Sequence, residues 1–204
     1  MEKVLLFVNG EPPQRYPTDL TQYRYIACTD GAYHNYLQQT DIIPHFIIGD
    51  LDSLGHQPIN KTIEIIHTPD QNKTDFEKSI LFLASKGIKA FDIYGASGHA
   101  SDHFLGNLSV AMQYYMHYDL TFYDNYCYFF FAKSKTVLHQ MKGKTISLIP
   151  LSKVSNLTIT GFKYPLNNTD LQLGGLTSLR NYAINEDITI QFENGDLVIF
   201  ISRK

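Results

Sequence analysis

The segment FIIGDLDS, residues 46–53, carries the pattern on which our fold assignment rests. Its first three residues, 46–48, form a short apolar run that is typical of a buried strand. Gly49 then leads into two aspartates, Asp50 and Asp52. Two carboxylates this close together at the end of a buried strand repel each other unless a cation neutralises them. The segment therefore predicts a strand that ends at a cation site.

Similar apolar runs recur along the first part of the chain and alternate with helical patterns. Strands separated by helices indicate an α/β layer with a mostly parallel sheet. The first of these runs is followed by Asn9-Gly10, a turn signal. We expect strands at residues 4–8, 25–28, 46–48, 91–94 and 120–123.

Two helices are predicted between these strands. The first begins at Thr74, which forms a capping box with Glu77, and it stops at Gly87. The second covers residues 102–117. Its apolar face is expected to consist of Leu105, Leu108, Met112 and Tyr115.

The pattern changes after about residue 125, where the helical signal ends. Short apolar runs separated by turn residues indicate an antiparallel sandwich or barrel. The last two runs flank Asn194-Gly195, which predicts a hairpin between them. We expect strands at residues 126–131, 136–139, 146–151, 157–162, 171–173, 188–192 and 197–201. These patterns predict one domain over residues 1–128 and a second over residues 129–204.

Composition excludes several classes of partner. The 204 residues are 44% hydrophobic, which is enough to form a substantial core, and the formal net charge is −3. This charge provides no basic field for nucleic acid or for acidic membranes. No apolar run approaches the roughly 20 residues that span a bilayer, and the first run is too short for a secretion signal. We therefore predict a cytoplasmic protein with no nucleic-acid or membrane partner.

Further aspartates occupy positions like those of Asp50 and Asp52. Asp30 follows the strand at 25–28, whereas Asp70, Asp75 and Asp102 lie near the starts of the two helices. In a parallel sheet, all these positions lie at the carboxyl ends of strands, where such folds bind ligands. Magnesium binds carboxylate, water and phosphate oxygens. Although any one of these acids could be a turn or helix-start residue, together they predict a magnesium and phosphate site.

Three basic residues lie close to these aspartates. Lys73 and Lys78 are candidates to neutralise phosphate oxygens, although lysines on a helix are often only solvated. His103, beside Asp102, is a candidate base or a packing residue.

Four segments, taken in order, resemble the thiamine pyrophosphokinase family. They are Thr29-Asp30-Gly31-Ala32, residues 49–53, residues 70–78, and Gly95-Ala96-Ser97-Gly98 followed by Asp102, His103 and Asn107. Residues 161–166 read GFKYPL and are similar to the family segment GLKYPL, and Asn181 matches the asparagine of a Ser-Asn pair. The resemblance therefore covers nearly the whole chain.

This resemblance implies both a fold and a reaction. The implied fold is an α/β nucleotide-binding catalytic domain followed by a thiamine-binding antiparallel β-sandwich. The implied reaction transfers the diphosphate of ATP to the hydroxyl of thiamine, giving thiamine diphosphate and AMP. The implied assembly is a homodimer with the site at the subunit interface.

The resemblance also implies roles for individual residues. Asp50, Asp52 and Asp75 would hold Mg²⁺, and Asp102 would orient the substrate hydroxyl or complete the metal site. Substrate and nucleotide contacts are expected from Asp30, Ser53, Asp70, Gln71, Lys73, Thr74, Lys78, His103, Arg180 and Asn181.

The chain departs from the family at one phosphate-binding position. Members carry Gly-Gly-Arg before the Asp-His pair, whereas residues 98–101 read Gly-His-Ala-Ser here. Imidazole does not reproduce the two parallel hydrogen bonds of a guanidinium group. Arg180, which replaces the serine of the Ser-Asn pair, is our candidate for restoring the lost positive charge.

Two alternative functions remain at this stage. Residues 46–54 are also similar to the nucleophile strand of haloacid-dehalogenase-type phosphatases, although Ser53 and Leu54 depart from that motif. The other alternative is a nucleotide- and thiamine-binding regulatory protein without turnover.

Overall fold

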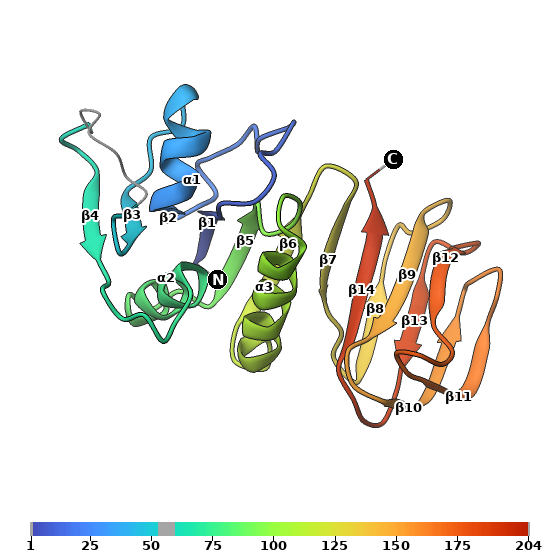
Figure 1. Cartoon of the computed structure of the whole chain (residues 1–204). Helices are drawn as coiled ribbons and strands as arrows, with labels where there is room; N and C mark the ends of the chain where they lie inside the picture. Colours follow the sequence, from blue (N-terminus) through green and yellow to red (C-terminus); the bar gives the residue numbers. More distant parts are fainter. Residues whose placement is uncertain (1, 53–59, 204) are drawn as a thin grey trace. The chain divides into compact units, whose positions relative to one another are not determined.

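The computed structural model describes residues 2–52 and 60–203, and it divides into two compact units (Figure 1). The first unit runs to Asn125 and the second begins at Tyr126. Within the described ranges, no helix has the length and apolar character required to cross a membrane.

The first unit is built on a parallel sheet. Its strand order is β6-β5-β1-β2-β3-β4, and each neighbouring pair in this order is parallel. The predicted parallel α/β architecture is therefore confirmed. The strands are β1 (Lys3–Phe7), β2 (Tyr25–Thr29), β3 (Phe46–Gly49), β4 (Glu64–His67), β5 (Ala90–Tyr94) and β6 (Asp119–Tyr123).

Helical segments cover both faces of this sheet. On one face Phe7 packs against Tyr36, which ends α1, with ring centroids 6.3 Å apart. On the other face Phe46 packs against Phe82 of α2 at 5.2 Å. Because both faces are covered, the central strands β1, β2 and β3 are buried along nearly their whole length rather than alternating. The helical segments are α1 (Asp30–Asn35), η1 (Leu37–Gln39), α2 (Asp75–Ser85) and α3 (Ser101–Tyr114).

The apolar face predicted for the second helix is partly wrong. Leu108 is buried in α3 as expected, but Leu105 is 65% exposed and Met112 is 36% exposed. The buried positions include Val110 and Ala111 instead. The first two turns of α3 place Asp102, His103 and Asn107 at a pocket, and the buried stripe of the helix is narrower than the sequence suggests.

The second unit is an antiparallel β-sandwich. One sheet has the order β12-β9-β14-β7 and the other β11-β10-β13-β8. Leu148 and Ile199 from the first sheet share one core with Ile159 and Ile190 from the second. This confirms the predicted sandwich. The strands are β7 (Cys127–Phe131), β8 (Lys135–Leu138), β9 (Thr145–Pro150), β10 (Val154–Thr160), β11 (Leu166–Leu171), β12 (Ser178–Tyr182), β13 (Ile188–Gln191) and β14 (Leu197–Ser202).

The predicted hairpin at Asn194-Gly195 is wrong. Strands β13 and β14 flank this turn, but β13 pairs with β10 and β8 while β14 pairs with β7 and β9. The turn therefore carries the chain from one sheet to the other. Asn194 instead forms an isolated bridge with Ser155.

The turn after β1 packs tightly against the turn after β5. The Gly10 N–H donates to the carbonyl oxygen of Gly95 at 2.6 Å. A Cβ atom on Gly10 would lie 2.3 Å from that oxygen and 2.5 Å from the carbonyl oxygen of Ser97. Both obstacles are backbone atoms, so the position requires glycine.

Two glycine substitutions should therefore change stability in opposite directions. Gly10→Ala is expected to lower the free energy of unfolding by about 2–3 kcal/mol, since it overpacks a rigid contact. Gly106→Ala, inside α3 with no atom within 4 Å of its added Cβ, should raise it by about 0.5–1 kcal/mol. Urea unfolding of both variants tests the pair, and an unchanged Gly10→Ala protein would contradict the packing argument.

Candidate active site

A pocket of about 430 Å³ lies at the carboxyl edge of the parallel sheet. It is lined by the turns after β1, β2 and β3 and by the first turns of α2 and α3. The strand order places β2 on one side of β1 and β5 on the other. Open α/β sheets bind ligands beside such a switch in strand order.

Most of the site residues predicted from the sequence meet in this pocket. Its lining includes Asp30, Asp50, Gln71, Lys73, Thr74, Asp75, Lys78, Asp102 and His103. Asp70 is absent from the lining, and its carboxylate instead accepts from the backbone N–H of Asn72 at 2.9 Å. Ser53 lies outside the described residues.

Other lining residues were not predicted as site residues. They are Val8, Asn9, Gly10, Thr29, Gly31, Phe76, Gly106 and Asn107. Asn9 and Gly10 follow β1 as Asp50 follows β3, so the rule applied to the aspartates would also have found them. They were interpreted only as a turn because they carry no charge.

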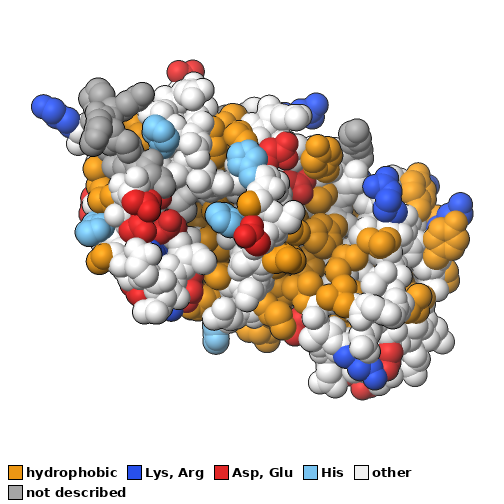
Figure 2. All heavy atoms as spheres, in the orientation of Figure 1, with side chains coloured by type: hydrophobic (Ala, Val, Ile, Leu, Met, Phe, Trp, Pro, Cys, Tyr) orange, Lys and Arg blue, Asp and Glu red, His pale blue; other side chains and the backbone are white. Residues whose placement is uncertain are grey.

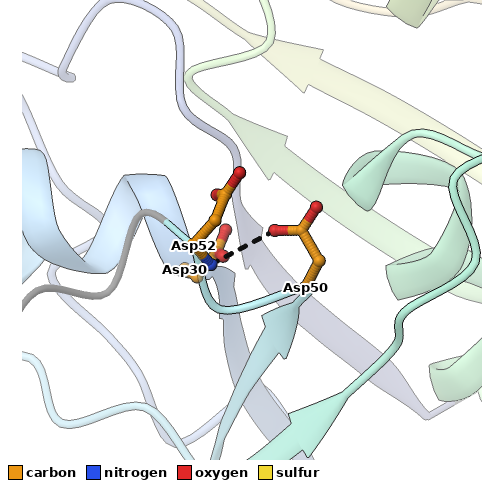
Figure 3. Close-up of side chains that lie close together, drawn as sticks. All are labelled: Asp30, Asp50 and Asp52. Carbon is orange, nitrogen blue, oxygen red and sulfur yellow. Dashed lines mark hydrogen bonds between the residues drawn. The ribbon is translucent and has the colours of Figure 1, made fainter.

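Three carboxylates lie close together, and two of them, Asp30 and Asp50, line the pocket whereas Asp52 does not. Asp30, Asp50 and Asp52 each have an oxygen within 4.8 Å of an oxygen of the other two (Figure 3). Asp30 is buried, Asp50 is half-buried and Asp52 is exposed. Figure 2 shows acidic side chains gathered on the surface of the first unit. Hard divalent cations prefer such oxygen ligands, so this donor set fits a magnesium-like ion.

Asp30 is held in place by the backbone around it. Its two oxygens accept from the N–H groups of Gly31 at 2.7 Å and Leu51 at 2.9 Å. A Cβ atom on Gly49 would lie 2.5 Å from the Asp30 carboxyl carbon, so the glycine at the end of β3 makes room for it. Burial raises the pKa of Asp30, and the nearby charges of Asp75 and Asp50 raise it further.

Leu51 has a left-handed backbone conformation, with φ at 71°. This conformation costs a residue with a side chain about 1–2 kcal/mol. It accompanies the hydrogen bond from Leu51 N–H to Asp30, and the next N–H, of Asp52, reaches Asp50 Oδ1 at 3.3 Å. Strain of this kind is commonly found at functional sites. The local backbone is thus arranged around the three carboxylates.

The predicted metal ligand Asp75 has a different partner. Its Oδ1 accepts from the ammonium group of Lys78 at 3.1 Å. The Lys78 side chain is only 6% exposed and lines the pocket. Another predicted metal ligand, Asp50, contacts Gln71. The Gln71 amide donates to Asp50 Oδ2 at 3.1 Å, and this hydrogen bond lowers the pKa of Asp50.

The start of α3 forms the opposite side of the pocket. Asp102 and His103 are exposed there, and the Asp102 carboxylate accepts from the His103 N–H at 2.9 Å. His99, where the family motif departs, has a left-handed backbone with φ at 55°. Ala100, which occupies the N-cap position, makes no side-chain capping hydrogen bond.

Two predicted site residues belong to the second unit. Asn181 is buried, and its amide group binds both the N–H and the carbonyl oxygen of Tyr164, at 3.2 and 2.8 Å. Asn181 therefore fixes the GFKYPL segment. Arg180 is exposed beside it in a left-handed conformation with φ at 50°, and its N–H donates to Ser147 Oγ.

An α/β pocket that combines clustered carboxylates with lysines defines a class of enzyme that transfers phosphoryl groups with a divalent cation. The comparisons with known proteins narrow this class. Residues 16–122 match the family described as thiamin pyrophosphokinase, catalytic domain. Residues 134–197 match the family described as thiamin pyrophosphokinase, vitamin B1 binding domain.

Individual relatives agree with these matches. The chain is 29% identical to thiamine pyrophosphokinase from Bacillus subtilis, over 98% of this chain and 99% of that protein. It is 30% identical to thiamine pyrophosphokinase 2 from Arabidopsis thaliana, over 98% and 86% of the two chains. The crystal structure of thiamine pyrophosphokinase from Bacillus subtilis superposes with a TM-score of 0.81 at 26% identity, covering 98% of each chain.

The chain belongs to the thiamine pyrophosphokinase family. This confirms the family predicted from the sequence and the transferase class that it implied, within thiamine diphosphate biosynthesis. The comparisons support this assignment rather than the phosphatase or the regulatory protein.

The raised pKa of Asp30 predicts how stability depends on pH. A carboxyl group whose pKa is higher in the folded than in the unfolded protein stabilises the fold most below its unfolded value, about 3.9, and this stabilisation is lost as the pH rises through the folded value. Without divalent cations, Asp30→Asn should therefore gain stability relative to the wild type from pH 4 to 7. Unfolding both proteins in urea and EDTA across this range measures the difference, and added Mg²⁺ should reduce it.

Asp19→Asn is the control, because its stability relative to the wild type should change with pH in the opposite direction. Hydrogen bonds from Thr21 lower the pKa of the exposed Asp19, so this variant should lose stability relative to the wild type as the pH rises. If the stabilities of the two variants, relative to the wild type, changed with pH in the same direction, the argument from the burial of Asp30 would be contradicted.

Proposed function

We propose that this chain transfers the diphosphate group of ATP to the hydroxyl of thiamine, forming thiamine diphosphate and AMP with Mg²⁺ as the cation. The observation that carries the proposal is the meeting of Asp30 and Asp50 with Lys73 and Lys78 in the lining of one pocket, with Asp52 close to the two aspartates, in a chain of this family. The relatives' names supply the acceptor, thiamine.

The reaction requires positioning and charge neutralisation more than covalent work by the protein. The thiamine hydroxyl oxygen forms a bond to the β-phosphorus of ATP. The bond from that phosphorus to the oxygen shared with the α-phosphate breaks, AMP leaves with the electron pair, and the hydroxyl proton is released. We assign Asp102, at the pocket, to orient the attacking hydroxyl.

We assign Asp50, Asp52 and Asp75 as ligands of the cation. Asp30 is not assigned as a ligand, and it would support the binding of the nucleotide. The proximity of Asp30, Asp50 and Asp52 supports the first two ligands. Asp75 lines the same pocket and is close enough for its charge to raise the pKa of Asp30. When bound, Mg²⁺ would neutralise the phosphate oxygens and the carboxylates together.

We assign the remaining predicted residues to substrate contacts. Lys73 and Lys78 would bind phosphate oxygens, while Gln71, Thr74 and His103 line the same pocket. Asp70, and Ser53 beyond the described residues, stay predictions that rest on the resemblance. Arg180 would add the positive charge that the Gly-Gly-Arg position lacks, and Asn181 would support it by fixing its neighbours.

We assign nucleotide binding and catalysis to the first domain, predicted as residues 1–128, and thiamine binding to the second, predicted as 129–204. The vitamin B1 binding match over residues 134–197 supports the second assignment. We further propose a homodimer with the site at the subunit interface, and a cytoplasmic location.

The first test is product formation. Wild-type protein with ATP, Mg²⁺ and thiamine should yield AMP and thiamine diphosphate in equal amounts, measured by chromatography. Asp50→Asn should lower kcat at least about 100-fold, because the carboxylate cluster loses a charge needed for the cation.

Asp187→Asn serves as the matched control for this test. Asp187 is an exposed aspartate that contacts His139 in the second unit, so its substitution should leave kcat unchanged. A wild type that gives neither product contradicts the proposed reaction, whereas an active Asp50→Asn protein contradicts the assigned site.

The second test concerns Arg180 and the dimer. Arg180→Ala should weaken ATP binding about 10-fold or more, since a charged hydrogen bond to phosphate is lost. Lys153→Ala, which breaks an exposed pair with Asp170, is the control. Unchanged ATP binding in Arg180→Ala would refute the proposal that Arg180 replaces the missing arginine.

If the site spans two subunits, co-expressed Arg180→Ala and Asp50→Asn chains should show more activity than the two variants mixed after separate purification.

A further inference from the structure

Glu77 accepts two hydrogen bonds on one carboxylate oxygen. Its Oε1 binds the ammonium group of Lys73 at 2.5 Å and the hydroxyl of Tyr114 at 2.8 Å. The Glu77 residue is 8% exposed. The sequence suggested that Glu77 serves a capping box, and its backbone N–H does donate to Thr74 Oγ1 at 3.2 Å. Its side chain, however, serves Lys73 and Tyr114.

Lys73 lines the pocket and lies just before the N-cap of α2. It is therefore outside the helix, and its side chain is 38% exposed. A lysine side chain that is free to rotate loses rotamer entropy when a ligand immobilises it. The bond to Glu77 fixes the ammonium group beforehand and uses one of its three N–H donors. Two donors remain for phosphate oxygens.

Tyr114 connects this pair to the other helix of the pocket. It is the last residue of α3, whose first turn carries Asp102 and His103 at the pocket. Burial raises the pKa of Tyr114, and the bond to Glu77 raises it further. The bond to Glu77 also raises the pKa of Lys73. Both groups consequently stay protonated and can act as donors at neutral pH.

We propose that Glu77 and Tyr114 are positioning residues that hold the ammonium group of Lys73 where it binds the phosphate chain of the nucleotide. The inference rests on the proposed function, because it takes a nucleoside triphosphate as the ligand of Lys73. Neither residue lines the pocket, so both act through Lys73.

The choice of variant matters because Glu77 also cancels part of the charge of Lys73. Glu77→Gln would change both the position of the Lys73 ammonium group and the charge beside it, and these two changes would have opposing effects on phosphate binding. Tyr114→Phe removes one hydrogen bond and leaves every charge in place. Tyr118→Phe is its matched control, since it removes another phenol hydroxyl four residues further on, from a ring that packs on Phe91.

The experiment measures the dissociation constant of Mg·ATP by calorimetry and kcat/KM for ATP with thiamine saturating. Tyr114→Phe should weaken Mg·ATP binding and lower kcat/KM about 3- to 10-fold, the range for loss of one hydrogen bond. KM for thiamine should stay unchanged, and Tyr118→Phe should match the wild type. Equal ATP parameters in Tyr114→Phe and wild type would overturn the inference.

A double-mutant cycle separates positioning from general structural support. In a Lys73→Ala background, Tyr114→Phe should have no further effect on Mg·ATP binding, because the group that it positions is gone. If Tyr114→Phe weakened Mg·ATP binding by the same factor with and without Lys73, the inference would be overturned.

The two proposals fail in different ways. A wild type that binds Mg·ATP without forming thiamine diphosphate overturns the proposed reaction, while a weaker Mg·ATP affinity in Tyr114→Phe still supports the positioning role. An active wild type with an unaltered Tyr114→Phe variant overturns the positioning role alone. A wild type that binds no Mg·ATP overturns both.

Discussion

The constraint that organises this protein is the mutual repulsion of carboxylates held at one edge of a parallel sheet. Asp30, Asp50 and Asp52 have oxygens within 4.8 Å of one another, and Asp30 is buried. The chain stabilises this arrangement locally, with two backbone N–H groups on Asp30 and a left-handed residue at Leu51. These hydrogen bonds orient the acids, and a bound cation would neutralise their charge. The site is therefore built for a partner that brings positive charge.

The lysines of the pocket are already engaged with acids of α2. Lys78 contacts Asp75 within the helix, and Lys73, just before the helix, contacts Glu77 in its first turn. Each pair places a lysine ammonium group at the pocket, while the acidic partner limits the local positive charge. Phosphate groups arriving with a divalent cation add less negative charge to such a lining than the free nucleotide would, so the pocket suits a metal–nucleotide complex better than either component alone.

Much of the fold could be predicted from the sequence because both units have regular patterns. The apolar runs predict β1, β2, β3, β5 and β6, but the short mixed segments EIIH and SLRNY did not reveal β4 and β12. The strand predicted at residues 171–173 coincides with β11 only at Leu171. The aspartates at strand ends located the pocket because their charge makes an unusual pattern. Neutral lining residues such as Asn9 carry no charge, so only their position directly after a strand could have identified them.

Side-chain partners were harder to predict than positions. A Thr-x-x-Glu pattern predicts a capping box from local spacing, yet Glu77 bonds to Tyr114, 37 residues away. The turn at Asn194-Gly195 predicts a hairpin, yet strand pairing across the sandwich directs β13 and β14 into different sheets. In both cases a contact distant in the sequence outweighs the local preference.

The burial of Asp30 has a consequence for the lifetime of the protein in a cell. A ligand that binds only the folded state increases stability with its own concentration. Because the folded chain gathers three carboxylates where a cation can bind, its resistance to proteases should follow the supply of nucleotide and divalent cation. The abundance of the enzyme would then adjust to the energy state of the cell.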